Sequence, residues 1–420
     1  MSSLTFTEFS NLKMKKTVRV CVIAAVICSV LIAFLNVLHQ HEVSLTESRD
    51  LRGFEAIAQM RETYHGKAGF LTEDVLYEAG ASMEEAYQPQ NMKRYDDGSL
   101  GPTNEAYAKY VISQGGLTRL FMTTFDYENP MGSYNVLSEM TGKRAAAFYR
   151  VRDGLVRYHL DLVYPPNPEK AGEKESIDRF ALSLEEKVRK PFYYDYFCGW
   201  ETSASNFGLF LIMIAFFCCI CAAPVFAGDY QSSMDSVLFC CRYGRSRLPR
   251  ARTRASMLFS ASLYGLCTLV YFGLFLLIFG PYGWNCPIQF TSVRSPVPLN
   301  YLQLHMLAWL AGLLGCLAMT GVTLLFSSAM RRPLPVIVGA AVLLFAPAFV
   351  PNALYTHVKD FLYLLPTSAF EVIDELFKVN MFFLFGRGVW TPAAIACSSI
   401  VVNVFSSVCA SKSFAGHLLR

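Results

Sequence analysis

Charged residues are scarce in this chain of 420 residues. Asp, Glu, Lys and Arg together make up 17% of it, against about 25% in soluble domains. Hydrophobic residues make up 53%, and the mean hydropathy is +0.31. This composition excludes an ordinary soluble protein and indicates an integral membrane protein.

The chain also lacks the motifs of an enzyme that binds nucleotides or metals. A G-x-x-x-x-G-K-[ST] phosphate loop is missing, because Gly142 and Lys143 are followed by Arg144 and no glycine stands upstream at the required spacing. An H-E-x-x-H pair is missing too, and His39 with His41 is interpreted as a solvated pair rather than a metal site. We therefore expect no catalytic residue, no metal and no directly bound cofactor. The apolar stretches hold no carboxylate, which argues against proton or sodium coupling.

Long apolar stretches are what the sequence has in abundance. Four of them are long enough to cross a hydrocarbon core of about 30 Å: Val20–Leu38, Phe207–Phe226, Met257–Gly280 and Leu302–Phe326. Leu334–Val350 is shorter and contains two prolines, and Trp390–Ala410 is diluted by serines. A cleaved signal peptide remains an alternative for the first stretch, although its length favours an uncleaved span.

We therefore expect an all-α polytopic membrane protein with six transmembrane helices and a mainly helical extracellular domain between the first two. The expected order is a cytoplasmic lead (1–16), TM1 (17–38), the extracellular domain (39–205), TM2 (206–226), a cytoplasmic coupling region (227–256), TM3 (257–280), an external loop (281–301), TM4 (302–326), a cytoplasmic loop (327–333), TM5 (334–350), an external loop with an interfacial helix starting near Ser368 (351–389), TM6 (390–410) and a cytoplasmic tail (411–420).

The distribution of charge predicts the orientation. With both termini inside, the cytoplasmic segments carry 14 basic residues against 3 acidic ones, whereas residues 39–205 carry 19 basic and 26 acidic ones. Because basic residues concentrate on the cytoplasmic side of membrane proteins, we expect a multi-pass protein of a bacterial plasma membrane with both termini in the cytoplasm.

The inserted domain is predicted to be helical. Thr72 is expected to cap a helix over 73–87, and 176–190 is expected to form an amphipathic helix, whereas 145–162 fits either a helix or a strand. An aromatic run precedes the second span and is interpreted as a membrane-interface belt, with a ligand platform as the alternative. The run comprises Phe192, Tyr193, Tyr194, Tyr196, Phe197 and Trp200.

Cysteine and polar residues near the spans give weaker predictions. Of the 13 cysteines, only Cys198 and Cys286 face outward in this topology, near the outer membrane surface, so a disulfide between them is a hypothesis. Five polar residues in or beside the spans are interpreted as helix-packing hydrogen bonders, with a role in a substrate pathway as the alternative. They are Asn36, Asn206, His305, Thr320 and Asn403.

The coupling region is crowded with arginine. Six arginines, from Arg242 to Arg254, follow a segment in which four apolar side chains recur at helical spacing, namely Tyr230, Met234, Val237 and Leu238. The pattern predicts one small amphipathic helix on the inner membrane surface.

The order of spans and this local pattern resemble the permease subunit of a bacterial ABC-2 type transporter. Such permeases have an acidic residue after the second span, then small residues, an apolar helix and a basic start to the third span. Asp229, Ser233, Val237–Leu238 and Gly244–Arg245 are the matching residues, although Asp229 stands where glutamate is commoner and Arg252 or Arg254 where lysine is expected. Residues 190–200 are also similar to those of uncharacterised Gram-positive members.

The resemblance implies partners and a set of coupling residues. A separate cytoplasmic ABC ATPase subunit would bind ATP and Mg²⁺, and a second permease copy or a paralogue would complete the pathway in the lipid bilayer; no nucleic acid is expected. The ATPase-coupling residues would be Asp229, Tyr230, Ser233, Met234, Val237, Leu238, Gly244 and Arg245.

Two functions follow from these patterns. One is an ATP-driven exporter of an amphipathic, lipid-like or peptide substrate; the other is a membrane sensor or scaffold whose acidic external domain binds a peptide, a cell-wall fragment or a partner protein. Six spans exceed what an anchor needs, which favours the exporter. An acidic outer domain favours cationic ligands through its field.

Overall fold

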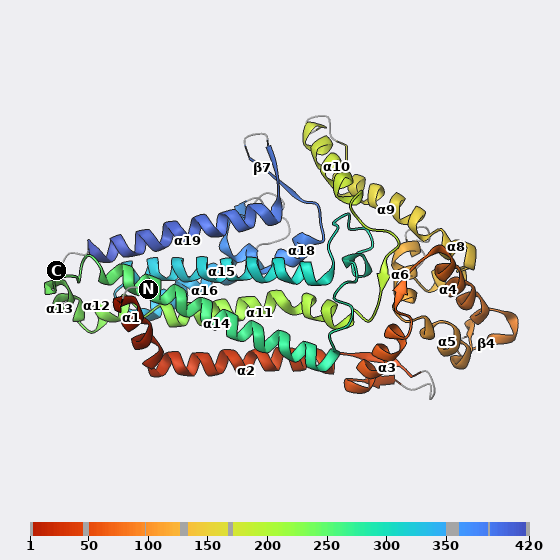
Figure 1. The fold of residues 1–420 in the computed structure, drawn as a ribbon, viewed down its shortest axis with the longest axis horizontal. Helices are drawn as coiled ribbons and strands as arrows, with labels where there is room; N and C mark the ends of the chain where they lie inside the picture. Colours follow the sequence, from red (N-terminus) through yellow and green to blue (C-terminus); the bar gives the residue numbers. More distant parts are fainter. Residues whose placement is uncertain are drawn as a thin grey trace.

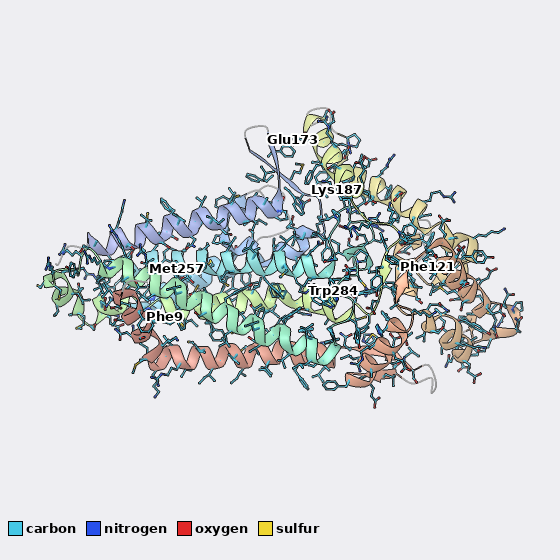
Figure 2. The ribbon with its side chains drawn as sticks, in the orientation of Figure 1. Phe9, Phe121, Glu173, Lys187, Met257 and Trp284 are labelled. Carbon is cyan, nitrogen blue, oxygen red and sulfur yellow. The ribbon has the colours of Figure 1, made fainter. Side chains whose placement is uncertain are left out.

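The computed structural model describes residues 3–44, 50–96, 98–126, 133–166, 171–349, 361–384 and 387–416. The chain is mostly helical and has two parts placed end to end (Figure 1). One part is a bundle of long helices, and the other is the inserted domain, residues 39–197. Phe121 lies in the inserted domain, Phe9 and Met257 lie at the far end of the bundle, and Trp284 lies where the two parts meet (Figure 2). We call the far end the basic end and the meeting point the junction end.

In the described part of the chain, five helices are long and apolar enough to cross a membrane, so the chain is a multi-pass membrane protein by length and composition. They are α2 (Lys16–Leu38), α11 (Cys198–Ala222), α14 (Leu248–Phe279), α15 (Tyr301–Ala329) and α19 (Thr391–Ala415). Each overlaps one of the predicted spans, but the bounds differ: α11 begins eight residues before the predicted start at residue 206 and ends at Ala222, short of the predicted end at residue 226.

The predicted fifth span, 334–350, is not a long helix in the described part of the chain. Helix α16 (Pro333–Phe345) has 13 residues, and at 1.5 Å per residue it is only about 20 Å long. The 3₁₀ turn η6 (Ala346–Phe349) follows it, with Pro347 at a position where a continuing helix would need a backbone N–H. Val350 and residues 351–360 of the predicted external loop lie outside the described residues, as do residues 417–420 of the predicted tail.

The inserted domain is helical, as predicted. The Thr72 hydroxyl accepts a hydrogen bond from the Val75 amide and begins α4, and the ambiguous segment 145–162 is mainly the helix α9. The domain's helices are α3 (Phe54–His65), α4 (Glu73–Ala86), α5 (Asn104–Tyr110), α6 (Gly116–Phe125), α7 (Ser133–Ser138), α8 (Gly142–Ala146), α9 (Phe148–Val163) and α10 (Ala171–Glu185), and its strands are β1 (His41–Val43), β2 (Asp50–Arg52), β3 (Gly69–Phe70), β4 (Met92–Arg94), β5 (Leu100–Pro102) and β6 (Tyr193–Tyr194). Three short two-stranded sheets join segments of the domain: β1 pairs with β2, β3 with β6, and β4 with β5.

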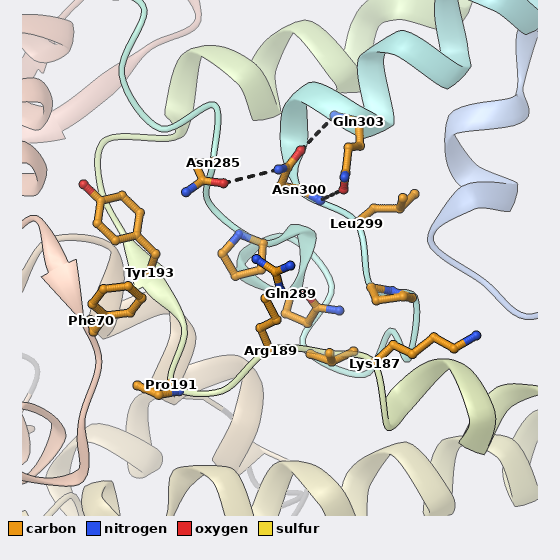
Figure 3. A pocket seen from close by; sticks show the side chains of 13 residues that line it. Phe70, Lys187, Arg189, Pro191, Tyr193, Asn285, Gln289, Leu299, Asn300 and Gln303 are labelled. Carbon is orange, nitrogen blue, oxygen red and sulfur yellow. Dashed lines mark hydrogen bonds between the residues drawn. The ribbon is translucent and has the colours of Figure 1, made fainter.

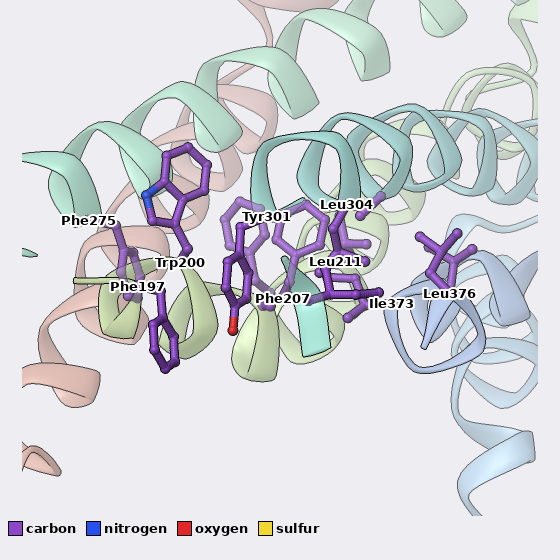
Figure 4. Packing of buried hydrophobic residues seen from close by; sticks show 14 of the residues in the cluster. Phe197, Trp200, Phe207, Leu211, Phe275, Tyr301, Leu304, Ile373 and Leu376 are labelled. Atoms are coloured by element: carbon purple, nitrogen blue, oxygen red, sulfur yellow. The ribbon is translucent and has the colours of Figure 1, made fainter. Parts of the chain in front are cut away.

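The aromatic run before α11 is a buried joint, so its interpretation as a membrane-interface belt is wrong. All of its side chains except Tyr193 are buried. The Phe197 ring stacks between Phe290 and Tyr301, at centroid distances of 5.0 and 5.7 Å. Figure 4 shows the packing continuing from Phe197 and Tyr301 toward Ile373. The sequence shows the aromatic run, but it does not show that the loop at 281–300 packs over these rings.

The predicted interfacial helix near Ser368 is also different. Residues 366–376 form a 3₁₀ turn, η7 (Pro366–Phe370), and one short helix, α18 (Val372–Leu376), both packed against α11 and α15. Gly315 allows this approach, because a Cβ there would lie 2.8 Å from the Cβ of Ala369. Since Gly315 is 14 residues into α15, or about 21 Å along it, η7 reaches into the middle of the bundle. A hairpin, β7 (Met381–Leu384) and β8 (Arg387–Trp390), then leads into α19.

A buried arginine fixes the inserted domain to the loop between α14 and α15. Arg152 of α9 is fully buried and forms an ion pair with Glu185 of α10. Its other guanidinium nitrogen donates to Glu185 Oε2 and to the Ser295 carbonyl, both at 2.9 Å. Three segments far apart in the sequence therefore meet on one side chain.

We expect Arg152→Ala to lower the free energy of unfolding by about 3 kcal/mol or more, because it leaves a buried carboxylate without its main partner. Arg150→Ala is the matched control: Arg150 is exposed on the same helix, and its loss should cost less than about 0.5 kcal/mol. Thermal unfolding of both purified variants in detergent measures the difference. Equal stability would show that the buried pair contributes nothing net.

Candidate functional site

The segment after α11 forms two short helices instead of the one predicted. They are α12 (Ala227–Gln231) and α13 (Met234–Cys240), and Ser233 separates them in the left-handed conformation with φ +57°. A left-handed residue cannot continue a right-handed helix. The predicted apolar face is therefore split, with Tyr230 on one helix and Met234 on the next. We call residues 227–240 the α12–α13 segment.

The base of this segment is fixed by an ion pair. Arg252 of α14 donates through Nη1 to Asp229 of α12 and through Nε to Glu8 of α1 (Ser3–Met14), the latter at 3.2 Å. Both carboxylates and the guanidinium are largely buried. Arg252 thus joins the N-terminal helix, the α12–α13 segment and a membrane-spanning helix.

A small cavity of about 250 Å³ lies beside this ion pair, and Lys15 also lines it. Burial raises the pKa of the Asp229 carboxyl, and the charge and hydrogen bond of Arg252 oppose the rise. Burial and the nearby Arg252 lower the pKa of Lys15. With Glu8 included, the cluster contains two basic and two acidic groups, so its charges can balance without solvent.

A serine on α15 fixes the turn between α11 and α12. Ser327 is fully buried, and its hydroxyl accepts from the amides of Phe226 and Ala227, at 3.1 and 2.9 Å, while donating to the Ala223 carbonyl at 2.7 Å. These backbone groups lie where one helix ends and the next begins, so they have no partner within a helix. One hydroxyl satisfies three of them.

Aromatic packing ties the same segment to the end of α19. The Phe414 ring lies 4.7 Å from Phe226, 5.6 Å from Tyr230 and 5.2 Å from Phe239, measured between centroids. The Tyr230 hydroxyl donates to the Ser328 carbonyl at 3.1 Å. The α12–α13 segment therefore contacts α14, α15 and α19.

The outer face of α13 is exposed. Met234 is 49% and Val237 59% exposed, whereas Leu238 is half-buried. Figure 1 places α13 at the extreme basic end of the bundle. The site residues named from the sequence therefore divide into an anchored base, Asp229 and Tyr230, and an apolar surface that nothing in the described chain covers.

Gly244 and Arg245 complete the turn that leads into α14. A Cβ on Gly244 would lie 1.7 Å from the Leu238 carbonyl oxygen, so only glycine fits there. The Arg245 guanidinium lies over the Phe239 ring, 4.4 Å from its centroid. The turn that precedes α14 thus packs directly on α13.

Of the five polar residues of the spans, Asn36, Asn206 and Thr320 make hydrogen bonds between helices, whereas the hydrogen bonds of His305 and Asn403 stay within their own helices. Asn206 donates to the Asn36 carboxamide oxygen at 2.5 Å, which joins α11 to α2, and Thr320 donates to Ser260 of α14 at 2.9 Å. His305 is fully buried among aromatic rings and contacts the Tyr301 carbonyl at 2.8 Å through Nδ1. Asn403 accepts from Ser407 of its own helix at 3.3 Å. All of these contacts are with other groups of the protein, and none of them indicates a substrate pathway.

The predicted disulfide is not formed. Cys198 and Cys286 are both free and buried at the junction end. Cys198 begins α11 and Cys286 lies in the loop packed against the inserted domain, so each thiol fills apolar space. Burial raises the pKa of Cys286, which keeps it protonated and unreactive.

A second cavity, of about 400 Å³, lies at the junction (Figure 3). The Phe70 and Tyr193 rings pack edge to face on one side of the cavity. On another side, the Asn300 carboxamide donates a hydrogen bond to the Asn285 carboxamide oxygen. Lys187 and Arg189 line it, and none of the described lining residues is acidic. Its size suits a small organic ligand, but its charge favours anionic groups, unlike the acidic composition of the inserted domain.

Comparisons of the chain with models of known families, with curated proteins and with solved structures find no match. No relative therefore supplies a function for this chain.

The Asp229–Arg252 pair should show strong energetic coupling, because both groups are largely removed from water. A double-mutant cycle with Asp229→Ala and Arg252→Ala is expected to give about 1–3 kcal/mol. The control is the exposed pair Glu175 and Arg179, four residues apart on α10, for which less than about 0.5 kcal/mol is expected. Thermal unfolding in detergent provides the free energies, and equal coupling for both pairs would contradict the buried role.

Ser327→Ala should destabilise the α11–α12 turn. Two backbone amides and one carbonyl lose their partner, at a cost of about 1–3 kcal/mol. Ser328→Ala is the control, because that hydroxyl donates only to the Leu325 carbonyl of its own helix. Hydrogen exchange at the amides of Phe226 and Ala227 should accelerate at least about fivefold in the first variant and remain unchanged in the second. Unchanged exchange in both variants would contradict the role of Ser327 in fixing the α11–α12 turn.

Proposed function

We propose that this chain is the membrane-spanning permease subunit of an ATP-driven exporter of the ABC-2 type, working with a separate ATPase subunit. The observation that carries the proposal is the α12–α13 segment, whose base is tied to α14, α15 and α19 while its outer face is apolar and exposed. A surface anchored on three membrane helices can pass a partner's movement to all three. This role agrees with the resemblance to ABC-2 permeases, which rests on Asp229, the small residues after it and the arginine-rich start of α14.

Six membrane crossings with both termini in the cytoplasm fit the path of the chain. Helices α15 and α19 both run from the junction end toward the basic end (Figure 1). Between them the chain must return, and α16 begins that return at Pro333, packed against α15 and α11. We infer that α16 belongs to a short sixth crossing, with the basic end in the cytoplasm of a bacterium and the inserted domain outside.

The pathway is proposed to lie between this chain and a second copy or a paralogue. The interior formed by α11, α14 and α15 is filled with large side chains such as Phe207, Phe210 and Tyr271, which stack on one another. A route through this packed core would need extensive rearrangement. Exposed apolar residues along α19 instead offer a surface for lipid, substrate or a second copy, and an amphipathic cargo suits such a surface.

The junction cavity favours a second candidate, a sensor whose outer part binds a ligand. Its Lys187 and Arg189, with the amides of Asn285 and Asn300, would bind a ligand that carries anionic or hydrogen-bonding groups. A peptide with a free carboxylate or a cell-wall fragment has such groups. The two roles are compatible, because the cavity and the α12–α13 segment lie at opposite ends of the bundle.

Co-purification tests the exporter. The tagged full chain, extracted from its native membrane in mild detergent, should bring a stoichiometric ATPase subunit and ATP hydrolysis with it. Met234→Asp and Val237→Asp should each weaken the association at least about tenfold, because burial of such a side chain contributes about 1.5–3 kcal/mol and about 1.4 kcal/mol is a factor of ten.

Ser236→Asp is the control, because it adds the same charge to a different side of α13, where the side chain is also exposed. Association retained in this variant and lost in the other two would place the partner on the Met234 and Val237 face. Purification of the intact chain without any ATPase, under conditions that preserve known transporter complexes, would overturn the exporter in favour of the sensor.

A further inference from the structure

A basic cavity lies between the start of α14 and the end of α19, on the side of α14 opposite the Arg252 ion pair. Its volume is about 580 Å³, and four basic side chains line it: Arg245, Arg250, Arg254 and Lys412. Hydroxyl groups of Ser246, Ser407 and Ser411 lie among them. Thr253 and Ser411 share a hydrogen bond of 3.0 Å, which joins the two helices at this point.

These four cations differ from Arg252 in that no carboxylate of the described residues neutralises them. No described residue lining the cavity is acidic, and the described part of the chain forms no ion pair with any of the four. Guanidinium and ammonium groups together with hydroxyls are the donors that bind phosphate. The cavity is therefore complementary to a phosphate group.

Next to the cavity, exposed apolar side chains of α14 and α19 continue along the outer surface of the bundle. Val408 lines the cavity and is 48% exposed, and Val404, one turn further along α19, is 58% exposed. On α14, the exposed Leu258 follows Arg254 by one turn. A ligand that fills both surfaces needs an anionic head and apolar chains.

We propose that this cavity binds the phosphate headgroup of an anionic phospholipid, whose acyl chains lie along Val404, Val408 and Leu258. The position fits, because the cavity is at the ends of two membrane-spanning helices, where headgroups lie. Arg245 also stacks on Phe239 of α13. A bound headgroup therefore holds the Arg245 side chain and, through it, the α12–α13 segment. The binding site does not depend on the proposed export function.

Native mass spectrometry of the detergent-purified full chain, titrated with phosphatidylglycerol or phosphatidylcholine, tests the proposal. We expect phosphatidylglycerol to bind at least tenfold more tightly, and Arg250→Gln with Arg254→Gln to remove most of that preference. Arg250→Lys with Arg254→Lys should keep it within about threefold, because the charge remains. This second pair of substitutions separates loss of the site from loss of the fold.

The matched control is Arg331→Gln with Arg332→Gln, which removes the same charge from exposed positions in the loop between α15 and α16, at the same end of the bundle. It should change the preference less than twofold. Equal binding of the two lipids, or an equal effect of the two Gln pairs, would overturn the site. Glycerol 1-phosphate competes as the soluble arm: displacement of the lipid at equimolar concentration would assign the cavity to a free phosphate ligand and overturn the lipid assignment.

Discussion

The arrangement at the basic end depends on the need to neutralise Arg252 where it is removed from water. An arginine near the end of a membrane-spanning helix normally extends to the headgroups, but Arg252 points inward and is largely buried. Asp229 and Glu8 supply the opposite charges from two other helices. Separating either helix from α14 would leave a largely buried charge without its partner. Helices α1 and α12 are therefore expected to move with α14, because moving apart costs more than moving together.

At the junction end, the fully buried Arg152 follows the same physical rule, whereas Arg119 is 45% exposed. Arg152 pairs with Glu185 inside the inserted domain and reaches the loop at Ser295, and Arg119 of α6 donates to both oxygens of Glu201 at the start of α11. The Arg152 hydrogen bond to Ser295 links α9 to the loop between α14 and α15, and the Arg119–Glu201 pair links α6 to α11. The start of α11 is thus held by the ion pair at Glu201 and its end by the Ser327 hydroxyl, so both ends of the helix are fixed to other parts of the structure.

Hydropathy and periodicity predicted the long helices well, because each needs only a local apolar run. They did not predict the break at Ser233, since neither glycine nor proline stands there to mark a turn. The roles of Glu8 and Ser327 could not be predicted either, because both act on residues that are distant in sequence, Arg252 and Ala227. The aromatic run was misassigned for the same reason: composition does not reveal the covering loop.

The positive-inside pattern treats all arginines of this segment alike, but the structure separates them by what they contact. Arg252 forms ion pairs with Glu8 and Asp229 and so holds α1 and α12 to α14. Arg245 stacks on an aromatic ring of α13, and Arg250 and Arg254 face a cavity without an acidic neighbour among the described residues. An orientation signal needs only the number of basic residues on the cytoplasmic side, so it does not explain this division. A paired cation and a set of unpaired cations on opposite sides of α14 are better explained by two tasks, one holding the helix ends and the other binding an anion at the membrane surface.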